Sequence, residues 1–296
     1  MTTILKRNKD VKHLVYLLYC LPVSSPEGAA MSRLPKAPIL FFSLLFLFFS
    51  AVHAHARTAV LFDQGHGQRF LIERGGDLDL SLLAGTFRDL DHEVSTTSKP
   101  ITGKILDGID VLMISGAFQP YTPEEIEAVT RFIERGGAVC ITLHIAPPLF
   151  GLLNRLGVEH SNGVIREEEG VINGDPINFR VTRLESHPLF QGMAQFSLYG
   201  VWALLDARAG VRSIARTSPS AWIDLNGNGR FDQGDARQSF TVAVAGEAGK
   251  GRFVVFGDDA VFQNKFLKGD NLILARNLAA WLAGGRQPSP PKNLVR

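Results

Sequence analysis

Between residues 58 and 157, continuous apolar runs alternate with stretches in which apolar residues recur at helical spacing. A continuous run such as Asp110–Ser115 predicts a strand that is buried on both faces of a sheet. In Asp77–Leu90 the apolar positions recur every three or four residues instead, which predicts an amphipathic helix. The elements expected here are strands at Thr58–Asp63, Glu93–Thr97, Asp110–Ser115 and Ala138–His144, and helices at 77–90, 122–135 and Pro147–Leu156.

The segment Thr122-Pro123-Glu124-Glu125 carries the strongest helix-start signal in the chain. Thr122 suits the N-cap, Pro123 suits the first helical position, and Glu125 stands where a capping box needs it. Gly136 and Gly137 end the same helix. Because strands and helices alternate at these lengths, we expect βαβ units and a parallel sheet.

From about residue 163 the pattern changes to short pieces typical of β-strands. These pieces lie at 177–182, 196–204, 211–216, 220–225 and 238–244. A last buried strand at Gly251–Gly257 and an amphipathic helix at Asp270–Leu282 follow. The prediction is one α/β domain over 57–283, a parallel sheet flanked by helices, with a β-rich insertion at about 163–245 before the last strand and helix. Residues 284–296 are rich in Gly and Pro, and we expect them to be disordered.

The N-terminal segment indicates export. Ile39–Val52 is an uncharged apolar run of 14 residues, shorter than the roughly 20 residues that span a bilayer. Arg33 and Lys36 precede it, and Ala54-His55-Ala56 follows as a cleavage pattern. We therefore predict a signal peptide at 31–56, a periplasmic or extracellular protein, and no stable membrane span after cleavage. An uncleaved anchor is the alternative. Residues 1–30 are then an upstream extension, with translation starting at Met1 or at Met31.

Composition and charge exclude several classes of protein. The 296 residues are 45% hydrophobic and 20% charged, which excludes a disordered chain. Residues 1–56 hold six basic and two acidic residues of the chain's 31 and 29, so the remainder carries a net charge of −2. That balance, without a basic cluster, argues against nucleic acid as a partner. The two cysteines, Cys20 and Cys140, form neither a disulfide framework nor a zinc site. Cys140 lies inside an apolar strand, where we expect a core residue.

Residues 224–235 match the twelve-residue calcium loop D-x-[DN]-x-[DN]-G-x5-E except at the last position. The pattern predicts six calcium ligands, of which Arg230 contributes a backbone carbonyl and Asp232 binds directly or through water. Asp235 stands in place of the usual Glu. The strand-like flanks indicate an isolated loop that braces the insertion and takes no part in catalysis. The alternative is a polar hairpin turn without metal. The expected ligands are Asp224, Asn226, Asn228, Arg230, Asp232 and Asp235.

Polar side chains also follow several of the expected parallel strands. Ligands of open α/β sheets collect at the carboxyl ends of strands, so these residues are candidates for one ligand site on a shared rim. His66, His144 and Asp258 are the candidates for proton transfer. The alternative is that all of them cap helices and tie loops. The rim candidates are Asp63, His66, Ser115, His144, Asp258 and Asn264.

Four segments carry a resemblance to a known superfamily: FDQGHGQRF at 62–70, TPEEIEAVTRFIERGGAV at 122–139, HPLFQGM at 187–193 and FGDDAVFQN at 256–264. Over about 58–283 the chain resembles the secreted or membrane-attached branch of the class I glutamine-amidotransferase-like superfamily. It is similar to uncharacterised bacterial domains of that fold, and more distantly to ThuA-like proteins and to gliding-motility and intraflagellar-transport relatives. The resemblance implies a flavodoxin-like sheet.

The position of the amidotransferase nucleophile departs from that superfamily. True amidotransferases carry a cysteine at the elbow after the strand equivalent to 138–143, where this chain has Leu143-His144-Ile145-Ala146. The departure implies a non-catalytic domain that binds a small molecule, a sugar or a protein, accessory to envelope transport or assembly. The alternative is a hydrolase or lyase that uses His66, His144 and Asp258. A tight cluster of those three side chains would favour catalysis, and separation or burial in ion pairs would favour binding.

Overall fold

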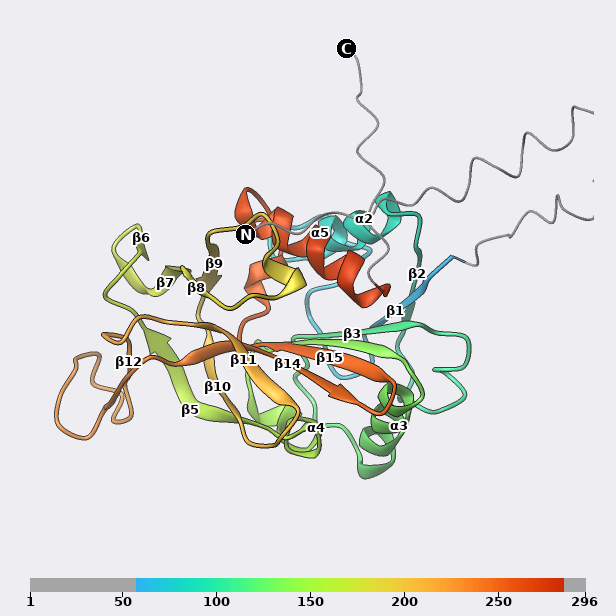
Figure 1. Cartoon of the computed structure of the whole chain (residues 1–296), viewed down its shortest axis with the longest axis horizontal. Helices are drawn as coiled ribbons and strands as arrows, with labels where there is room; N and C mark the ends of the chain where they lie inside the picture. Colours follow the sequence, from blue (N-terminus) through green and yellow to red (C-terminus); the bar gives the residue numbers. More distant parts are fainter. Residues whose placement is uncertain (1–56, 285–296) are drawn as a thin grey trace, which may run out of the picture. The chain divides into compact units, whose positions relative to one another are not determined.

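The computed structural model describes residues 57–284 as a mixed α/β domain built on a large sheet (Figure 1). The predicted signal peptide, the upstream extension and the tail beyond Gly284 lie outside the described residues. Five strands form a parallel group in the order β2-β1-β3-β4-β15. Their bounds are β1 Ala59–Asp63, β2 Glu93–Thr97, β3 Val111–Ser115, β4 Ala138–Thr142 and β15 Gly251–Phe256.

Helices cover both faces of this parallel group (Figure 1). Strands β3 and β4 are buried along their whole length, because apolar side chains meet a helix layer on each side. Phe62, Phe87 and Leu278 belong to the core beneath α2 and α5, whereas Phe132 and Leu152 belong to the core beneath α3 and α4. The helices are α2 Ser81–Asp89, α3 Pro123–Glu134, α4 Phe150–Leu156 and α5 Asp270–Leu282, with short 3-10 turns η2 Pro147–Leu149, η3 Pro188–Phe190 and η4 Ala260–Phe262.

The sheet is larger than the predicted parallel sheet, because antiparallel strands extend it beyond β15 to twelve strands among the described residues. The extension runs β15-β14-β10-β5-β12-β13, with β11 paired to β14 and β8 paired to β11. A separate sheet of the described region has the order β6-β7-β9. The remaining strands are β5 Val158–Arg166, β6 Val171–Ile172, β7 Asp175–Val181, β8 Arg183–Leu184, β9 Phe196–Tyr199, β10 Trp202–Asp206, β11 Val211–Arg216, β12 Trp222–Ile223, β13 Ala236–Arg237 and β14 Thr241–Ala248.

The connection between β14 and β15 explains why the parallel order ends there. Ala248 pairs with Gly251, so that only Gly249 and Lys250 form the turn, and Gly249 has a φ of 61°. A two-residue loop joins antiparallel strands and is far too short for a parallel crossover. The strand next to β15, on the side away from β4, is therefore the antiparallel strand β14.

Helix α2 begins at Ser81, later than the expected start at Asp77. The preceding residues are used to hold a distant loop, because the carbonyl groups of Asp77 and Asp79 accept hydrogen bonds from the backbone N–H groups of Lys265 (2.7 Å) and Asn264 (2.9 Å). The Asp79 carboxylate accepts two further backbone N–H groups, from Leu71 and Gly76. Among residues 57–284, no helix has the length and apolar character needed to cross a membrane.

The predicted core position of Cys140 on β4 is confirmed, because its side chain is fully buried. Burial raises the pKa of its thiol far above the usual range, which keeps the sulfur protonated and unreactive.

Replacing this thiol by a hydroxyl tests its structural role. We expect Cys140→Ser to lower the free energy of unfolding by about 1 kcal/mol, because a hydroxyl is placed in an apolar site. Urea unfolding of the variant and of the wild type measures this difference. Any activity of the protein should be intact in the folded variant, and a specific loss of activity would contradict a purely structural role.

Candidate functional site

The structure separates the six rim candidates. Two lie in a buried network, two line a pocket, and the other two hold neighbouring segments together through hydrogen bonds. Asp63 and His66 lie in a buried hydrogen-bonded network between β1 and α3. His144 and Asp258 line a pocket at the ends of β4 and β15. Ser115 Oγ accepts a hydrogen bond from the Thr142 hydroxyl at 2.8 Å across β3 and β4. The rim therefore holds more than one kind of site.

Asn264 joins the loop after β15 to the start of α2. Its side-chain oxygen accepts the Leu82 N–H at 2.9 Å, and its amide donates to the Gly76 carbonyl and to the Ser81 hydroxyl. All of its side-chain polar atoms are engaged in this way, so Asn264 holds the loop rather than facing the pocket.

The His66 imidazole bridges two carboxylates in the buried network. Its Nδ1 lies 2.8 Å from Asp63 Oδ2, and its Nε2 lies 3.0 Å from Glu125 Oε1. Ionised carboxylates only accept hydrogen bonds, so both ring nitrogens donate and the ring is an imidazolium. Tyr121 stacks on the ring with centroids 3.7 Å apart, and its hydroxyl donates to Asp63 Oδ2. Gln68 Nε2 donates to the same oxygen at 2.7 Å.

Charge stabilises the protonated ring against the cost of burial. Burial by itself lowers the pKa of His66, but the hydrogen bonds and negative charges of Asp63 and Glu125 outweigh burial and raise that pKa above 6.5. Burial opposes the ionisation of Glu125, yet the N–H groups of Thr122 and Ile101 lower its pKa overall. The capping box predicted at Thr122 is confirmed, and its glutamate also holds His66.

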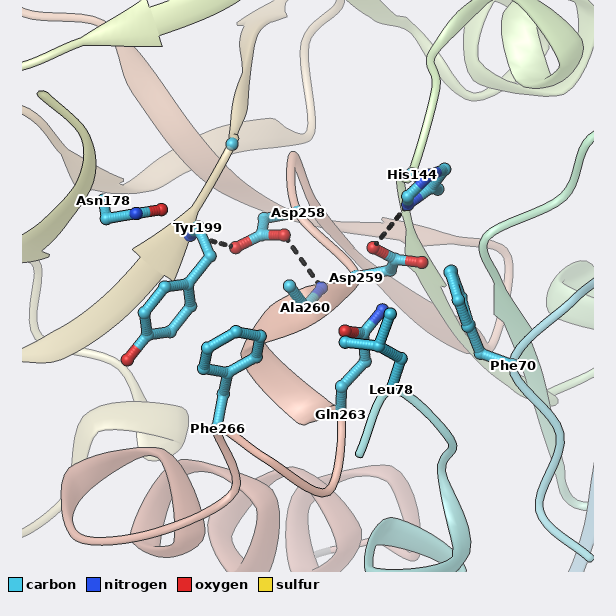
Figure 2. Close-up of a pocket in the computed structure, with 11 residues that line it drawn as sticks. Phe70, Leu78, His144, Asn178, Tyr199, Asp258, Asp259, Ala260, Gln263 and Phe266 are labelled. Carbon is cyan, nitrogen blue, oxygen red and sulfur yellow. Dashed lines mark hydrogen bonds and ion pairs between the residues drawn. The ribbon is translucent and has the colours of Figure 1, made fainter. Parts of the chain in front are cut away.

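Figure 2 shows the pocket, which encloses about 370 Å³ at the carboxyl ends of β4 and β15. The side chains of Tyr199 and Phe266 lie on the side of Asp258, and those of His144 and Phe70 lie on the side of Asp259. The β-rich segment supplies one wall through Asn178, Tyr199 and Gly200. The full lining is Phe70, Leu78, His144, Asn178, Tyr199, Gly200, Asp258, Asp259, Ala260, Gln263 and Phe266.

Asp259 and His144 form the polar pair of the pocket. His144 Nδ1 lies 3.2 Å from Asp259 Oδ1, and this hydrogen bond raises the pKa of His144 although partial burial opposes it. The histidine side chain is 39% exposed, whereas Asp259 is 2% exposed. Asp259 Oδ2 is buried without a hydrogen-bond partner among the described residues. A buried acceptor of this kind gains free energy when a ligand donates to it.

Asp258 lies beside this pair in a different chemical state. Its Oδ2 accepts the Tyr199 N–H at 2.7 Å and its Oδ1 accepts the Ala260 N–H at 2.8 Å. Burial, and then the charge of Asp259, raise the pKa of Asp258 well above its usual range, although the two N–H groups oppose that rise. A protonated carboxyl here can donate a hydrogen bond as well as accept one.

Aromatic rings form the apolar walls. Tyr199 stacks on Phe266 with centroids 3.8 Å apart. On the other side, the ring centroid of Phe70 lies 5.1 Å from that of His144, and Phe118, outside the lining, packs behind His144 with centroids 5.0 Å apart. No sequence pattern indicates Tyr199 or Phe266 as site residues, because short β-strands do not show which other segment they approach. Asp259 is adjacent in sequence to the candidate Asp258, and only the hydrogen bonds of the two carboxylates distinguish their roles.

The loop at 224–235 folds around the first of its expected ligands. The Asp224 carboxylate accepts backbone N–H groups from Gly227, Asn228 and Gly229, at 2.7, 3.2 and 2.7 Å. Asp235 closes the loop by accepting the N–H groups of Leu225 and Asp232.

The donor set of this loop fits calcium chemically, because the side chains of all five Asp and Asn ligands offer oxygen and Arg230 offers a carbonyl. In the present geometry the amides of Asn226 and Asn228 donate to Asp232. Within the described part of the chain, no three His, Cys, Asp or Glu side chains converge as a metal site. Calcium binding thus requires these two amides to turn their oxygens inward.

Comparison with known proteins places this mixed α/β domain in a family. The chain belongs to the family described as "Domain of unknown function (DUF4350)", which matches residues 84–282. No curated protein matches the chain in sequence.

Solved structures are similar to this chain at low sequence identity. The mmIFT52 N-terminal domain has a TM-score of 0.63 at 16% identity, over 78% of this chain and 99% of that one. A cytoplasmic protein from Salmonella typhimurium LT2 has a TM-score of 0.50 at 13% identity, over 76% and 99%. A ThuA-like protein from Bacteroides uniformis has a TM-score of 0.47 at 14% identity, over 79% and 94%. The expected likeness to an intraflagellar-transport relative is confirmed at the level of fold.

The His66 network makes stability depend on pH. Because the folded-state pKa of His66 is raised, its charged form contributes stability below about pH 6.5, the pKa of free histidine. That contribution falls as the pH rises through the folded-state pKa. We expect His66→Asn to lower the free energy of unfolding at pH 6 by about 3 kcal/mol, since it breaks a buried ion pair.

Urea unfolding between pH 5.5 and 9 measures this effect. The loss caused by His66→Asn should shrink as the pH rises. His187→Asn serves as the control and should not reproduce this pH dependence, because burial lowers the pKa of His187 to about 4, below the range measured. A constant difference between wild type and His66→Asn over the whole range would show that His66 does not change charge there.

Proposed function

We propose that this protein is an exported, non-catalytic member of the class I glutamine-amidotransferase-like superfamily that binds a neutral, hydroxyl-rich small molecule, namely a sugar, in the pocket at the ends of β4 and β15. The buried Oδ2 of Asp259, which has no hydrogen-bond partner among residues 57–284, is the observation that carries the proposal, because such an acceptor gains free energy when a ligand donates to it. The binding domain would serve envelope transport or assembly.

The parallel group of strands supports the superfamily and the flavodoxin-like core. Its order β2-β1-β3-β4-β15 is the doubly wound order 2-1-3-4-5. The fold shared with the mmIFT52 N-terminal domain supports the same placement. In such sheets ligands bind outside the carboxyl ends of the strands, which is where this pocket lies.

Separation of the catalytic candidates supports binding over turnover. His66 uses both ring nitrogens in buried ion pairs and does not line the pocket. Both carboxylate oxygens of Asp258 accept hydrogen bonds from backbone N–H groups. The elbow position after β4 holds Leu143 and His144, and Cys140 is buried within the strand. The pocket therefore lacks the thiol nucleophile of the superfamily.

The chemistry of the lining supports a sugar. Asp259 accepts hydrogen bonds, the Gln263 amide both donates and accepts them, and the Tyr199–Phe266 pair offers an aromatic wall. A hydroxyl both donates and accepts, so a polyol matches this mixture better than an anion does. An anion would meet the charge of Asp259.

One observation favours the second candidate, a hydrolase or lyase. His144 is oriented by Asp259 through Nδ1 and is partly exposed to the pocket, as a general base would be. In this alternative His144 moves a proton on the bound molecule, while Asp258 in its protonated form acts as an acid. Slow conversion of a bound sugar by the wild type and none by His144→Gln would establish this candidate.

The N-terminal apolar run and cleavage pattern support export, and the net charge of −2 after residue 56 supports a partner other than nucleic acid. We further propose that calcium at 224–235 braces the long connection between β12 and β13. The hydrogen bonds of Asp224 and Asp235 support this role, because they already hold the loop in a closed conformation.

Calorimetric titration with a panel of neutral mono- and disaccharides tests the sugar site. We expect at least one to bind, and Asp259→Asn to weaken that binding about tenfold or more, since a hydrogen bond to a charged acceptor contributes about 1.5–3 kcal/mol. Asp89→Asn, an exposed position on α2, is the control and should leave the affinity unchanged. Absence of heat with every saccharide, from a folded protein, would count against a sugar ligand.

Calcium titration after chelation tests the loop. We expect a dissociation constant on the order of 10⁻⁴ to 10⁻³ M, as in extracellular modules. At ten times that concentration calcium should stabilise the fold by about 1.4 kcal/mol. Asp224→Ala should abolish the shift in melting temperature, and magnesium at equal ionic strength should reproduce little of it. An unchanged melting temperature of the wild type in several millimolar calcium would reduce the loop to a polar turn.

A further inference from the structure

A second pocket lies at the opposite edge of the sheet, near the amino end of β15. It encloses about 440 Å³ between the β14–β15 hairpin, the start of β11, η3 and the end of α5. Its chemistry comes from Arg212, Arg252, His187, Trp281 and Glu247. None of these residues lines the pocket of the proposed sugar site.

Two guanidinium groups in this pocket have no ion-pair partner. Among residues 57–284, the guanidinium of neither Arg212 nor Arg252 forms a salt bridge or donates a hydrogen bond. Glu247 stands opposite Arg252 across β14 and β15, and it attracts Arg252 without forming an ion pair. The pocket therefore carries one positive charge in excess. Partial burial lowers the pKa of Arg252, which is the sign of a cation that lacks sufficient compensation.

His187 adds a neutral donor to the two cations. Its Nδ1 accepts the Leu189 N–H at 3.3 Å, so the proton of the neutral ring resides on Nε2. Burial, and then the charge of Arg212, lower the pKa of His187 to about 4. The ring is consequently neutral at pH 7 and available as a hydrogen-bond donor.

Trp281 provides the flat apolar wall of the pocket. The Arg252 guanidinium lies 5.3 Å from the centroid of its ring, and the His187 ring meets it edge to face at 5.2 Å. Stacking on the indole orients the planar guanidinium, which reduces the freedom that Arg252 loses when it binds a ligand.

We propose that this pocket binds a small molecule that carries an oxyanion, either a carboxylate or a phosphate, on a planar apolar body. Arg212 and Arg252 bind the oxyanion, because guanidinium groups match the geometry of carboxylate and phosphate oxygens. Nε2–H of His187 supplies a further donor, and the planar body packs against Trp281. The volume suits a small organic ligand. This site does not depend on the sugar-binding proposal, since it uses other residues at the other edge of the sheet.

Tryptophan fluorescence and calorimetry with simple probes test the proposal. Phenyl phosphate and benzoate should bind and change the emission of Trp281, and inorganic phosphate should bind more weakly by calorimetry. Benzyl alcohol, which has the ring without the charge, should not bind. A stronger response to phenyl phosphate identifies a phosphate ligand, and a stronger response to benzoate identifies a carboxylate; either preference supports the site.

Variants connect binding to the named residues. Arg212→Gln and Arg252→Gln should each weaken the better probe at least tenfold, and Trp281→Phe should remove the fluorescence change. Arg276→Gln, exposed on the same helix as Trp281 and outside the pocket lining, should leave binding unchanged. Melting temperatures show that each variant is folded, and exposed Arg212 is the variant that carries the test if Arg252→Gln unfolds. No binding of either aromatic probe, or an equal loss in Arg276→Gln, would overturn the proposal.

Discussion

The arrangement of the loops at the carboxyl ends of the parallel strands depends on one buried imidazolium, which lies between two carboxylates. His66 joins Asp63, at the end of β1, to Glu125, in the first turn of α3. Burying a charge is costly, and here the cost is offset because both ring nitrogens and both carboxylates have partners. Glu125 at the same time caps its own helix and accepts the N–H of Ile101. A single side chain therefore fixes a strand end, a helix start and a connecting loop.

The same contact places part of the ligand pocket. The His66 carbonyl accepts the N–H groups of Phe118 and Gln119, both at 2.9 Å, so the loop after β3 follows the position of His66. Phe118 then packs beside His144, and the Arg69 guanidinium lies 4.5 Å from the centroid of the Phe118 ring. Loss of the imidazolium would disturb the wall of the pocket as well as the stability of the fold. His66 acts on the pocket through these contacts and does not line it.

Sequence patterns were sufficient for the parts of the structure that local chemistry determines. The capping box at Thr122, the buried strands β3 and β4, and the bounds Glu93–Thr97 and Asp270–Leu282 follow from apolar spacing and end signals. The strand Val158–Arg166 was missed because its polar middle does not alternate with apolar residues. Its position in the sheet comes from pairing with β10, about 40 residues later in the chain, and no local signal reports such a pairing.

The candidate site shows the same division. Strand ends indicate His144 and Asp258, which line one pocket, because parallel strands bring their carboxyl ends to one edge. Strand ends do not show that His66 belongs to a buried network instead of the pocket, because its role depends on a glutamate 59 residues away in sequence. Nor do they distinguish Asp259, whose Oδ2 has no hydrogen-bond partner among the described residues, from Asp258, whose oxygens both accept hydrogen bonds. The sequence indicates which polar residues follow the strands. Contacts in the folded protein decide which of their polar atoms are left to bind a ligand.

The two pockets at the ends of β15 have opposite electrostatic character. Asp258 and Asp259 follow the strand at one edge of the sheet, and Arg252 stands near its beginning at the other edge. An anion entering the first pocket would face the unpaired oxygen of Asp259, and a cation entering the second would face Arg212 and Arg252. Repulsion of the wrong ligand contributes to specificity as much as attraction of the right one. Charge segregation along a single strand would thus allow one small domain to bind the two proposed ligands, which differ chemically, without competition between them.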